Sequence, residues 1–194
     1  MIEKLEAVEQ IGKIVLNTDS SRIRTMYGRS QKIQLISCRQ EPQEIEMELT
    51  SDKLTAAMLE HTDGEHFLQL GAIFPFVKQD TIERVIETYC NDVLNSEDRR
   101  YDSVFTIRAF DRRLFDSDNY LVREDRPNTF IEDGILHVFN RTAFTANGNR
   151  KVGRKPYSYS VHEIENMAID SEENYKLARF VDENRHLFPR VFGR

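Results

Sequence analysis

The chain has 194 residues, enough for one sizeable core, and its 39% hydrophobic and 31% charged residues are typical of a globular protein. This composition excludes a disordered or fibrous chain. The net charge of −6 argues against uniform attraction to nucleic acid or anionic lipid, but it leaves room for a local basic patch. No stretch approaches the ~20 apolar residues that span a bilayer, and no secretory signal pattern opens the chain. We therefore expect a cytoplasmic protein with no membrane partner.

Residue periodicity predicts a mixture of helices and strands in the first half of the chain. Apolar residues at three- and four-residue spacing predict a helix over residues 2–16. Strand patterns at 32–38 and 44–49, separated by a proline, predict a hairpin. A short helix is expected to begin near Ser51. The nearly continuous apolar run 66–74 predicts a central strand.

The second half begins with the clearest helix of the chain, at residues 81–94. Asp80 and Glu83 form a capping box at its start, and one broad apolar stripe follows. Alternation over 103–110 predicts another strand, and the charged stretch 111–128 predicts a long loop. A final helix is expected to begin at Asp170, which has a glutamate three residues later.

Two hairpins are expected between the long loop and the final helix. Asp133-Gly134 is a strong two-residue turn signal between apolar segments. A longer hairpin would pair 135–144 with 157–164, with a projecting basic tip at about 145–157. The whole chain is thus predicted to be a single α+β domain, residues 1–194. Its sheet would be largely antiparallel, with three or four helices packed mainly on one face.

The most informative feature of the sequence is the segregation of charge. Residues 135–161 contain no Asp or Glu, and their five positive charges leave −11 for the rest of the chain. Cationic and aromatic side chains on one hairpin are suited to contacting a phosphate backbone and stacking on bases. The candidate nucleic-acid-binding residues in this span are Arg141, Arg150, Lys151, Arg154, Lys155, Tyr157 and Tyr159. A second basic patch that adds to them contains Arg22, Arg24 and Arg29.

Two histidines offer an alternative that involves catalysis. His137 and His162 would lie on opposite arms of the long hairpin, with Lys151 nearby in sequence. Two imidazoles and one cation are the components of a metal-independent phosphodiesterase or ribonuclease. A structural role for both histidines is the competing interpretation, because a register shift of one residue would place the rings on opposite faces.

Taken together, these patterns favour a non-enzymatic binding protein whose basic hairpin engages a polyanion, most plausibly nucleic acid. The first alternative is a protein–protein interaction module, such as an adaptor, an assembly factor or an inhibitor of a larger complex. Its partner would be an acidic protein surface, a second protein or another copy of the chain. No cofactor and no metal site are expected, because the sequence lacks the common phosphate-binding and metal-binding motifs.

Overall fold

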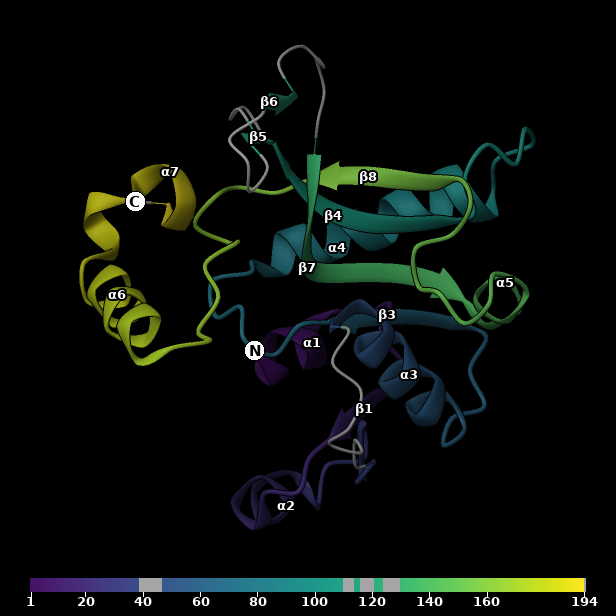
Figure 1. Ribbon diagram of the computed structural model, residues 1–194. Helices are drawn as coiled ribbons and strands as arrows, with labels where there is room; N and C mark the ends of the chain where they lie inside the picture. Colours follow the sequence, from purple (N-terminus) through teal and green to yellow (C-terminus); the bar gives the residue numbers. More distant parts are fainter. Residues whose placement is uncertain (39–46, 110–113, 116–120, 124–129, 194) are drawn as a thin grey trace.

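The computed structural model describes residues 1–38, 47–109, 114–115, 121–123 and 130–193. Helices and strands are interleaved along the chain, around a four-stranded sheet in the order β3-β7-β4-β8 (Figure 1). The elements are α1 (Ile2–Ala7), β1 (Ile14–Asn17), α2 (Ser21–Tyr27), β2 (Ile33–Ile36), α3 (Met47–Leu59), β3 (His66–Leu70), α4 (Gln79–Thr88), the π-helix η1 (Tyr89–Leu94), β4 (Ser103–Ala109), β5 (Leu114–Phe115), β6 (Leu121–Arg123), β7 (Phe130–Asn140), α5 (Arg141–Ala146), β8 (Pro156–Ser160), α6 (Glu172–Glu183), the 3₁₀ turn η2 (Arg185–Leu187) and α7 (Pro189–Phe192).

The main sheet is mixed. Strand β7 pairs antiparallel with β3 on one side and with β4 on the other, whereas β4 and β8 run parallel. A second pair, β1 and β2, is also parallel. The expected combination of helices and strands is present, but the prediction of a largely antiparallel sheet is wrong. Parallel pairing requires long crossover connections between strands, and no short sequence pattern records which strands those connections bring together.

The order of the strands also corrects the long hairpin predicted for residues 135–164. Strand β7 ends at Asn140, whose side chain caps α5 by accepting a hydrogen bond from the Ala143 N–H at 2.6 Å. The chain then returns as β8, which pairs with β4 rather than with β7. Strand β4 therefore lies between the two proposed arms, and these arms do not form a hairpin.

Asp133-Gly134 lies inside the continuous strand β7 and not at a hairpin turn. Gly134 has a positive φ of 71°, a conformation that glycine adopts without strain. At this point the register with β4 shifts, from Phe105 opposite His137 to Ile107 opposite Glu132. The same residue pair that favours a tight turn thus forms a β-bulge, which redirects the neighbouring carboxylates.

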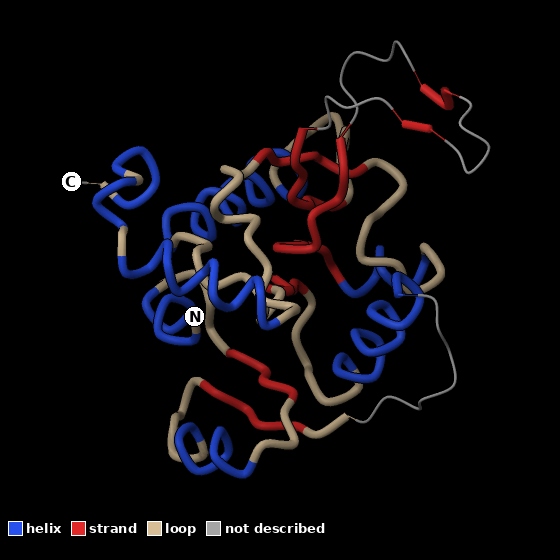
Figure 2. The backbone as a smooth tube through the Cα atoms, turned by 60° about the vertical axis from the view of Figure 1, so that its left-hand side comes forward, coloured by secondary structure: helices blue, strands red, loops and turns tan. Residues whose placement is uncertain are grey.

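Helices cover both faces of the main sheet, which differs from the expectation of one covered face (Figure 2). Leu136 and Val138 of β7 pack into the main core cluster with Ile82 and Val85 of α4. Phe139 points to the other face. There it packs in a smaller cluster with two other buried residues, Leu59 of α3 and Phe144 of α5. Because five consecutive β7 residues are buried, this strand forms the centre of the fold.

The first half of the chain differs most from its predicted elements. The expected helix over 2–16 ends at Ala7, and Ile14 begins strand β1, since pairing with β2 gives these residues strand hydrogen bonds. The basic stretch around Arg22 is helix α2. Met47–Leu59 form α3, so the predicted strand 44–49 is wrong from residue 47 onward, and its earlier residues lie outside the described ones. Strand β3 is at the edge of the described sheet rather than at its centre.

The helix predicted for residues 81–94 is confirmed as α4 and η1. Its apolar stripe is buried, with Ile82 and Val85 both 0% exposed. Strand β4 also lies where the sequence places a strand. Within the described part of the chain, no helix is both long and apolar enough to cross a membrane.

The cap of α6 is Ser171 rather than Asp170, because the Ser171 Oγ accepts a hydrogen bond from the Asn174 N–H at 3.1 Å. We expect Ser171→Ala to lower the free energy of unfolding by about 1 kcal/mol, the usual effect of losing an N-cap hydrogen bond. Urea denaturation followed by circular dichroism measures this change. Asp170→Ala is the control and is expected to change stability less; an equal loss in both variants would contradict the assignment of the cap.

Candidate active site

Strands β3, β4 and β8 all run in one direction, so their carboxyl ends meet at one edge of the sheet, where β7 begins. Ligands of open α/β sheets bind beside such an edge. The β-bulge in β7 places Asp133 at this edge of the sheet. Its carboxylate accepts hydrogen bonds from the Thr106 hydroxyl, the Ile135 N–H at 3.0 Å and the Asn166 side chain at 3.2 Å. Burial raises the pKa of Asp133 despite these donors.

Glu132 and His137 form a close pair on the face of β7 that α3 covers. The Nε2 atom of His137 lies 2.6 Å from Oε1 of Glu132, and His137 is only 4% exposed. The hydrogen bond from His137 lowers the pKa of Glu132, and the charges of His137 and Lys151 add to this effect against the opposing influence of burial. Glu132 is thus held as a carboxylate beside a buried imidazole.

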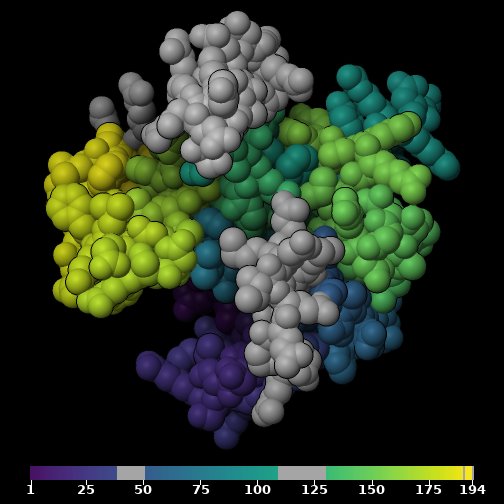
Figure 3. Space-filling view, viewed as in Figure 1, coloured from purple at the N-terminus to yellow at the C-terminus, as the bar shows by residue number. Residues whose placement is uncertain are grey.

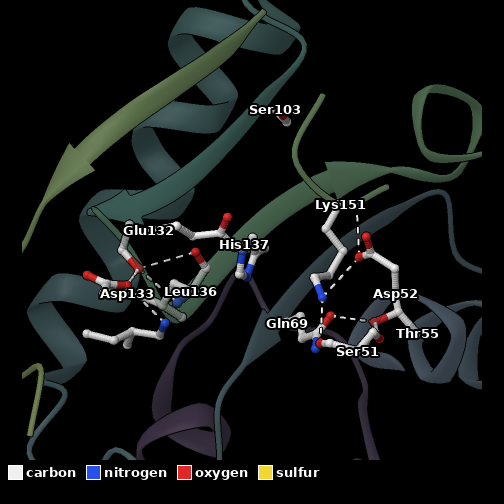
Figure 4. A network of polar contacts seen from close by, with 12 residues as sticks. Ser51, Asp52, Thr55, Gln69, Ser103, Glu132, Asp133, Leu136, His137 and Lys151 are labelled. Atoms are coloured by element: carbon white, nitrogen blue, oxygen red, sulfur yellow. Dashed lines mark hydrogen bonds and ion pairs between the residues drawn. The ribbon is translucent and has the colours of Figure 1, made fainter. Parts of the chain in front are cut away.

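A second polar group lies on the same face, next to α3 (Figure 4). The Nζ of Lys151 contacts the Ser51 hydroxyl at 2.7 Å and the Asp52 carboxylate at 3.1 Å. The Thr55 hydroxyl donates to the side-chain oxygen of Gln69 at 2.7 Å, and Gln69 is the cross-strand neighbour of His137. These residues and the pair on β7 form a polar network inside an interface that helix–sheet packing normally fills with apolar side chains.

The network reaches the surface beside α3. A pocket of about 360 Å³ lies between Asp52, Lys53 and Glu60 of α3 and the turn at 148–150. Figure 3 shows this turn and α3 side by side on the surface, in light green and blue. Asp52 lines the pocket and also pairs with Lys151, so the pocket connects solvent to the buried network.

The shifted acidities predict how stability depends on pH. The pKa of Glu132 is lowered in the fold, so its contribution to stability is present above the unfolded value of 4.5 and is lost as pH falls through the folded value. We expect Glu132→Gln to weaken the loss of stability on acidification. Urea midpoints measured at intervals between about pH 3 and pH 7 test this expectation.

Asp133 provides a contrast of opposite sign. Its pKa is raised in the fold, so its contribution is full below the unfolded value of 3.8 and is lost as pH rises through the folded value. Asp133→Asn removes the loss of stability that ionisation of Asp133 causes as pH rises. The free energy of unfolding should therefore rise more steeply with pH in this variant than in the wild-type protein. Equal slopes in the two variants would show that neither carboxylate is shifted as the structure indicates.

The five cationic residues of the predicted hairpin do not gather into one patch. Lys151 is buried and paired with Asp52, and Arg141 donates to carbonyl oxygens at the end of α3. Arg150, Arg154 and Lys155 are exposed. The backbone N–H groups of the last two donate to Asp102, which fixes this segment against the start of β4.

The other predicted contact residues are dispersed. Tyr157 and Tyr159 of β8 pack against the main core cluster, and the ring of Tyr157 meets that of Tyr101 edge-on at 5.0 Å. The second basic patch lies on and just after α2. There Arg24 donates to the Thr18 and Ile36 carbonyls, while Arg22 and Arg29 are exposed.

His137 and His162 are separated by the intervening strand β4, since His137 is on β7 and His162 follows β8. The Nδ1 of the exposed His162 accepts the Ile164 N–H at 3.2 Å within its own turn. The structure therefore does not form the predicted pair of catalytic histidines. Among the described residues, no three His, Cys, Asp or Glu side chains are grouped so as to hold a metal ion.

No family model matches the sequence, and no curated protein matches it. Solved structures do match the fold. The 4-diphosphocytidyl-2C-methyl-D-erythritol synthase from Anaerococcus prevotii DSM 20548 superposes with a TM-score of 0.69 at 15% identity, over 94% of this chain and 84% of that one. Another 4-diphosphocytidyl-2C-methyl-D-erythritol synthase gives a TM-score of 0.63 at 12% identity, over 93% of this chain and 87% of that one. CMP:2-keto-3-deoxy-manno-octonic acid synthetase, complexed with CTP, gives 0.58 at 8% identity, over 94% and 86%.

The chain shares the fold of these two synthases and of the synthetase. This finding overturns the prediction of a non-enzymatic binding protein for nucleic acid, and with it the interaction-module alternative, because the similar structures are a CTP-bound synthetase and two synthases. The ribonuclease alternative fails because strand β4 separates His137 from His162. Because ligands of α/β sheets bind beside the carboxyl ends of the strands, the polar network near this edge is the candidate active site.

Several residues of this network were absent from the sequence-based candidates, namely Asp52, Gln69, Glu132 and Asp133. The sequence did contain a sign of Gln69, because this polar residue interrupts the apolar residues that follow His66 in β3. Asp133 was interpreted as a turn residue because Asp-Gly is the commonest hairpin signal. Asp52 and Lys151 are 99 residues apart, and no local pattern connects them.

Proposed function

We propose that the protein is a nucleotidyltransferase that uses CTP, transferring the cytidylyl group to an acceptor and releasing pyrophosphate. The observation that carries this proposal is the match of the fold to cytidylyl-linked synthases over 94% of the chain. A synthetase of the same fold is complexed with CTP, which supports cytosine as the base of the nucleotide.

The polar network also supports the proposal, because it offers the kind of groups that this reaction requires. Transfer of a nucleotidyl group requires an acceptor oxygen held in line with the α-phosphorus and shielded from water, which would otherwise compete as the nucleophile. Gln69, Glu132, His137 and Lys151 provide polar groups in a covered position. They lie on the face of the sheet adjoining the edge where nucleotides bind in folds of this class.

The direct test is binding followed by turnover. Isothermal titration with CTP as its Mg²⁺ complex should give a dissociation constant below about 1 mM, with ATP and UTP binding more weakly. Pyrophosphate release is then measured with CTP and a panel of acceptors that includes 2-keto-3-deoxy-manno-octonic acid, other sugar acids and polyol phosphates.

The proposal is wrong if CTP gives no binding signal in the titration and does not raise the temperature of thermal unfolding. A preference for ATP over CTP would keep the nucleotidyltransferase class and overturn the assignment of the base. Exposed Arg29→Met is a suitable control for the assays, since this side chain belongs neither to the network of Figure 4 nor to the lining of the pocket beside α3.

A further inference from the structure

The pocket beside α3 has the size and the walls of a site for a small ligand. Its volume of about 360 Å³ falls within the range of roughly 300–1,000 Å³ that ligand pockets occupy. One wall is the side of α3 that carries Ala56 and Ala57, and the other is the turn at 148–150. Because these alanine side chains are short and apolar, an aliphatic ligand can lie close against the helix, between the charged residues of the lining.

Two of the charged side chains that line the pocket already have partners in the protein. The carboxylate of Asp52 pairs with the Nζ of Lys151 at 3.1 Å, and Lys53 also makes a contact within the chain. Within the described residues, no hydrogen bond or ion pair engages the side chains of Glu60 and Arg150, which are both exposed. The pocket therefore offers one carboxylate and one guanidinium to a ligand.

These two groups come from opposite ends of the pocket. The N–H of Lys151 donates to Oδ1 of Asp52 at 3.4 Å, so the adjoining Arg150 lies beside the first half of α3. Glu60 directly follows the last residue of α3. At 1.5 Å per residue, about 12 Å of helix separates the levels of Asp52 and Glu60. Between them lie the two alanines of the helix wall.

We propose that this pocket binds a small aliphatic zwitterion of the ω-amino acid class. Its carboxylate accepts hydrogen bonds from the Arg150 guanidinium, a fork of donors that matches a carboxylate. Its ammonium group donates to the Glu60 carboxylate, and its methylene groups lie on Ala56 and Ala57, where they are removed from water. Such binding requires neither CTP nor an acceptor, so this inference is independent of the proposed function.

The charges of the lining select a zwitterion over a ligand with a single charge. A simple anion would pair with Arg150 but would also lie near the carboxylates of Asp52 and Glu60. A simple cation would pair with Glu60 and be repelled by Arg150 and Lys53. A ligand that carries both charges in the right order avoids both repulsions.

The test compares probes that differ in charge but not in the nature of their aliphatic chain. The zwitterions are γ-aminobutyrate and ε-aminocaproate, caproate carries only the anion, and hexylamine carries only the cation. Each is titrated into nitrogen-15-labelled protein and followed by NMR. We expect at least one zwitterion to shift the amide signals of Ala56, Ala57 and Gly148 saturably, with a Kd at least about tenfold lower than that of either single-charge probe.

Two variants assign the charges of the ligand to their partners. We expect Arg150→Met and Glu60→Gln each to weaken binding of the zwitterion by about tenfold or more, the effect of losing one charge-assisted hydrogen bond. Both residues are exposed, so neither substitution is expected to disturb the fold. Arg29→Met is the matched control, because it removes an exposed arginine that does not line the pocket, and it should bind the zwitterion like the wild-type protein.

The outcomes that would overturn the inference are equally specific. If neither zwitterion shifts these amide signals at tens of millimolar, the pocket is not a site for this class of ligand. Equal affinity for caproate or hexylamine would show that only one of the two charges is read. Unchanged binding in Arg150→Met or Glu60→Gln would remove the residue concerned from the site. None of these results bears on CTP, so the proposed function stands or fails by its own titration.

Discussion

Lys151→Met is expected to lower the free energy of unfolding by about 2 kcal/mol, because it removes a buried cation from its half-buried carboxylate partner. The Lys151 side chain is 6% exposed and that of Asp52 is 20% exposed, so water compensates only in part for the lost partner. Methionine fills a similar volume, so the loss measures charge and hydrogen bonding rather than a cavity. Urea denaturation at pH 7 measures the effect.

Two further variants separate the ion pair from other causes. Lys155→Met removes an exposed lysine of the same segment and is expected to leave stability within about 0.5 kcal/mol of the wild-type value. The double variant Asp52→Leu with Lys151→Met should recover most of the loss, since an apolar pair avoids burying charge. No recovery in the double variant would mean that Lys151 stabilises the fold by another route.

Arg141→Met is expected to lower the free energy of unfolding by about 2 kcal/mol, through carbonyl oxygens that lose a charged donor. The guanidinium donates to the carbonyls of Leu59 at 3.2 Å, Thr62 at 2.8 Å and Gly64 at 3.0 Å. It also stacks over the ring of Phe67, 5.1 Å from its centroid. Arg141 therefore caps the carboxyl end of α3 and ties it to the start of α5.

The geometry of the guanidinium, rather than its charge, is what this capping requires. Arg141→Lys keeps the charge but cannot reach three carbonyls at once, so we expect it to recover less than half of the lost stability. Arg150→Met serves as the control for removing an exposed arginine nearby. Full recovery by lysine would show that the positive charge beside the helix end is the main contribution.

The elements that the sequence predicts well are those stabilised by their own residues. The helix at residues 81–94 carries its apolar stripe locally, and it is confirmed as α4 and η1. The predicted Asp80–Glu83 capping box does not form, because the helix begins at Gln79 and the Asp80 carboxylate pairs with Arg84. The segment 2–16 has a helical spacing of apolar residues as well, yet Ile14–Asn17 form a strand because β2 supplies hydrogen bonds. Tertiary pairing thus overrides local periodicity wherever the partner strand lies far along the chain.

The candidate site was largely beyond prediction for the same reason. Its charged partners come together only after α3 has packed on the sheet and the segment before β8 has crossed over it. The absence of acids in 135–161 is a real feature of the sequence, but folding supplies Asp52 to Lys151 from far upstream. A charge pattern along the chain therefore does not reveal which cations face solvent.

The position of β7 has a consequence for how the protein is made. Both strands that flank it, β3 and β4, leave the ribosome earlier, and neither can pair with the other across the place that β7 occupies. Each presents an unpaired edge during synthesis, which is the condition that favours association between nascent chains. Strand β7 can join β3 to β4 only when residue 140 has emerged, so slowing translation before that point would lengthen the exposure of these edges to chaperones and to neighbouring polypeptides.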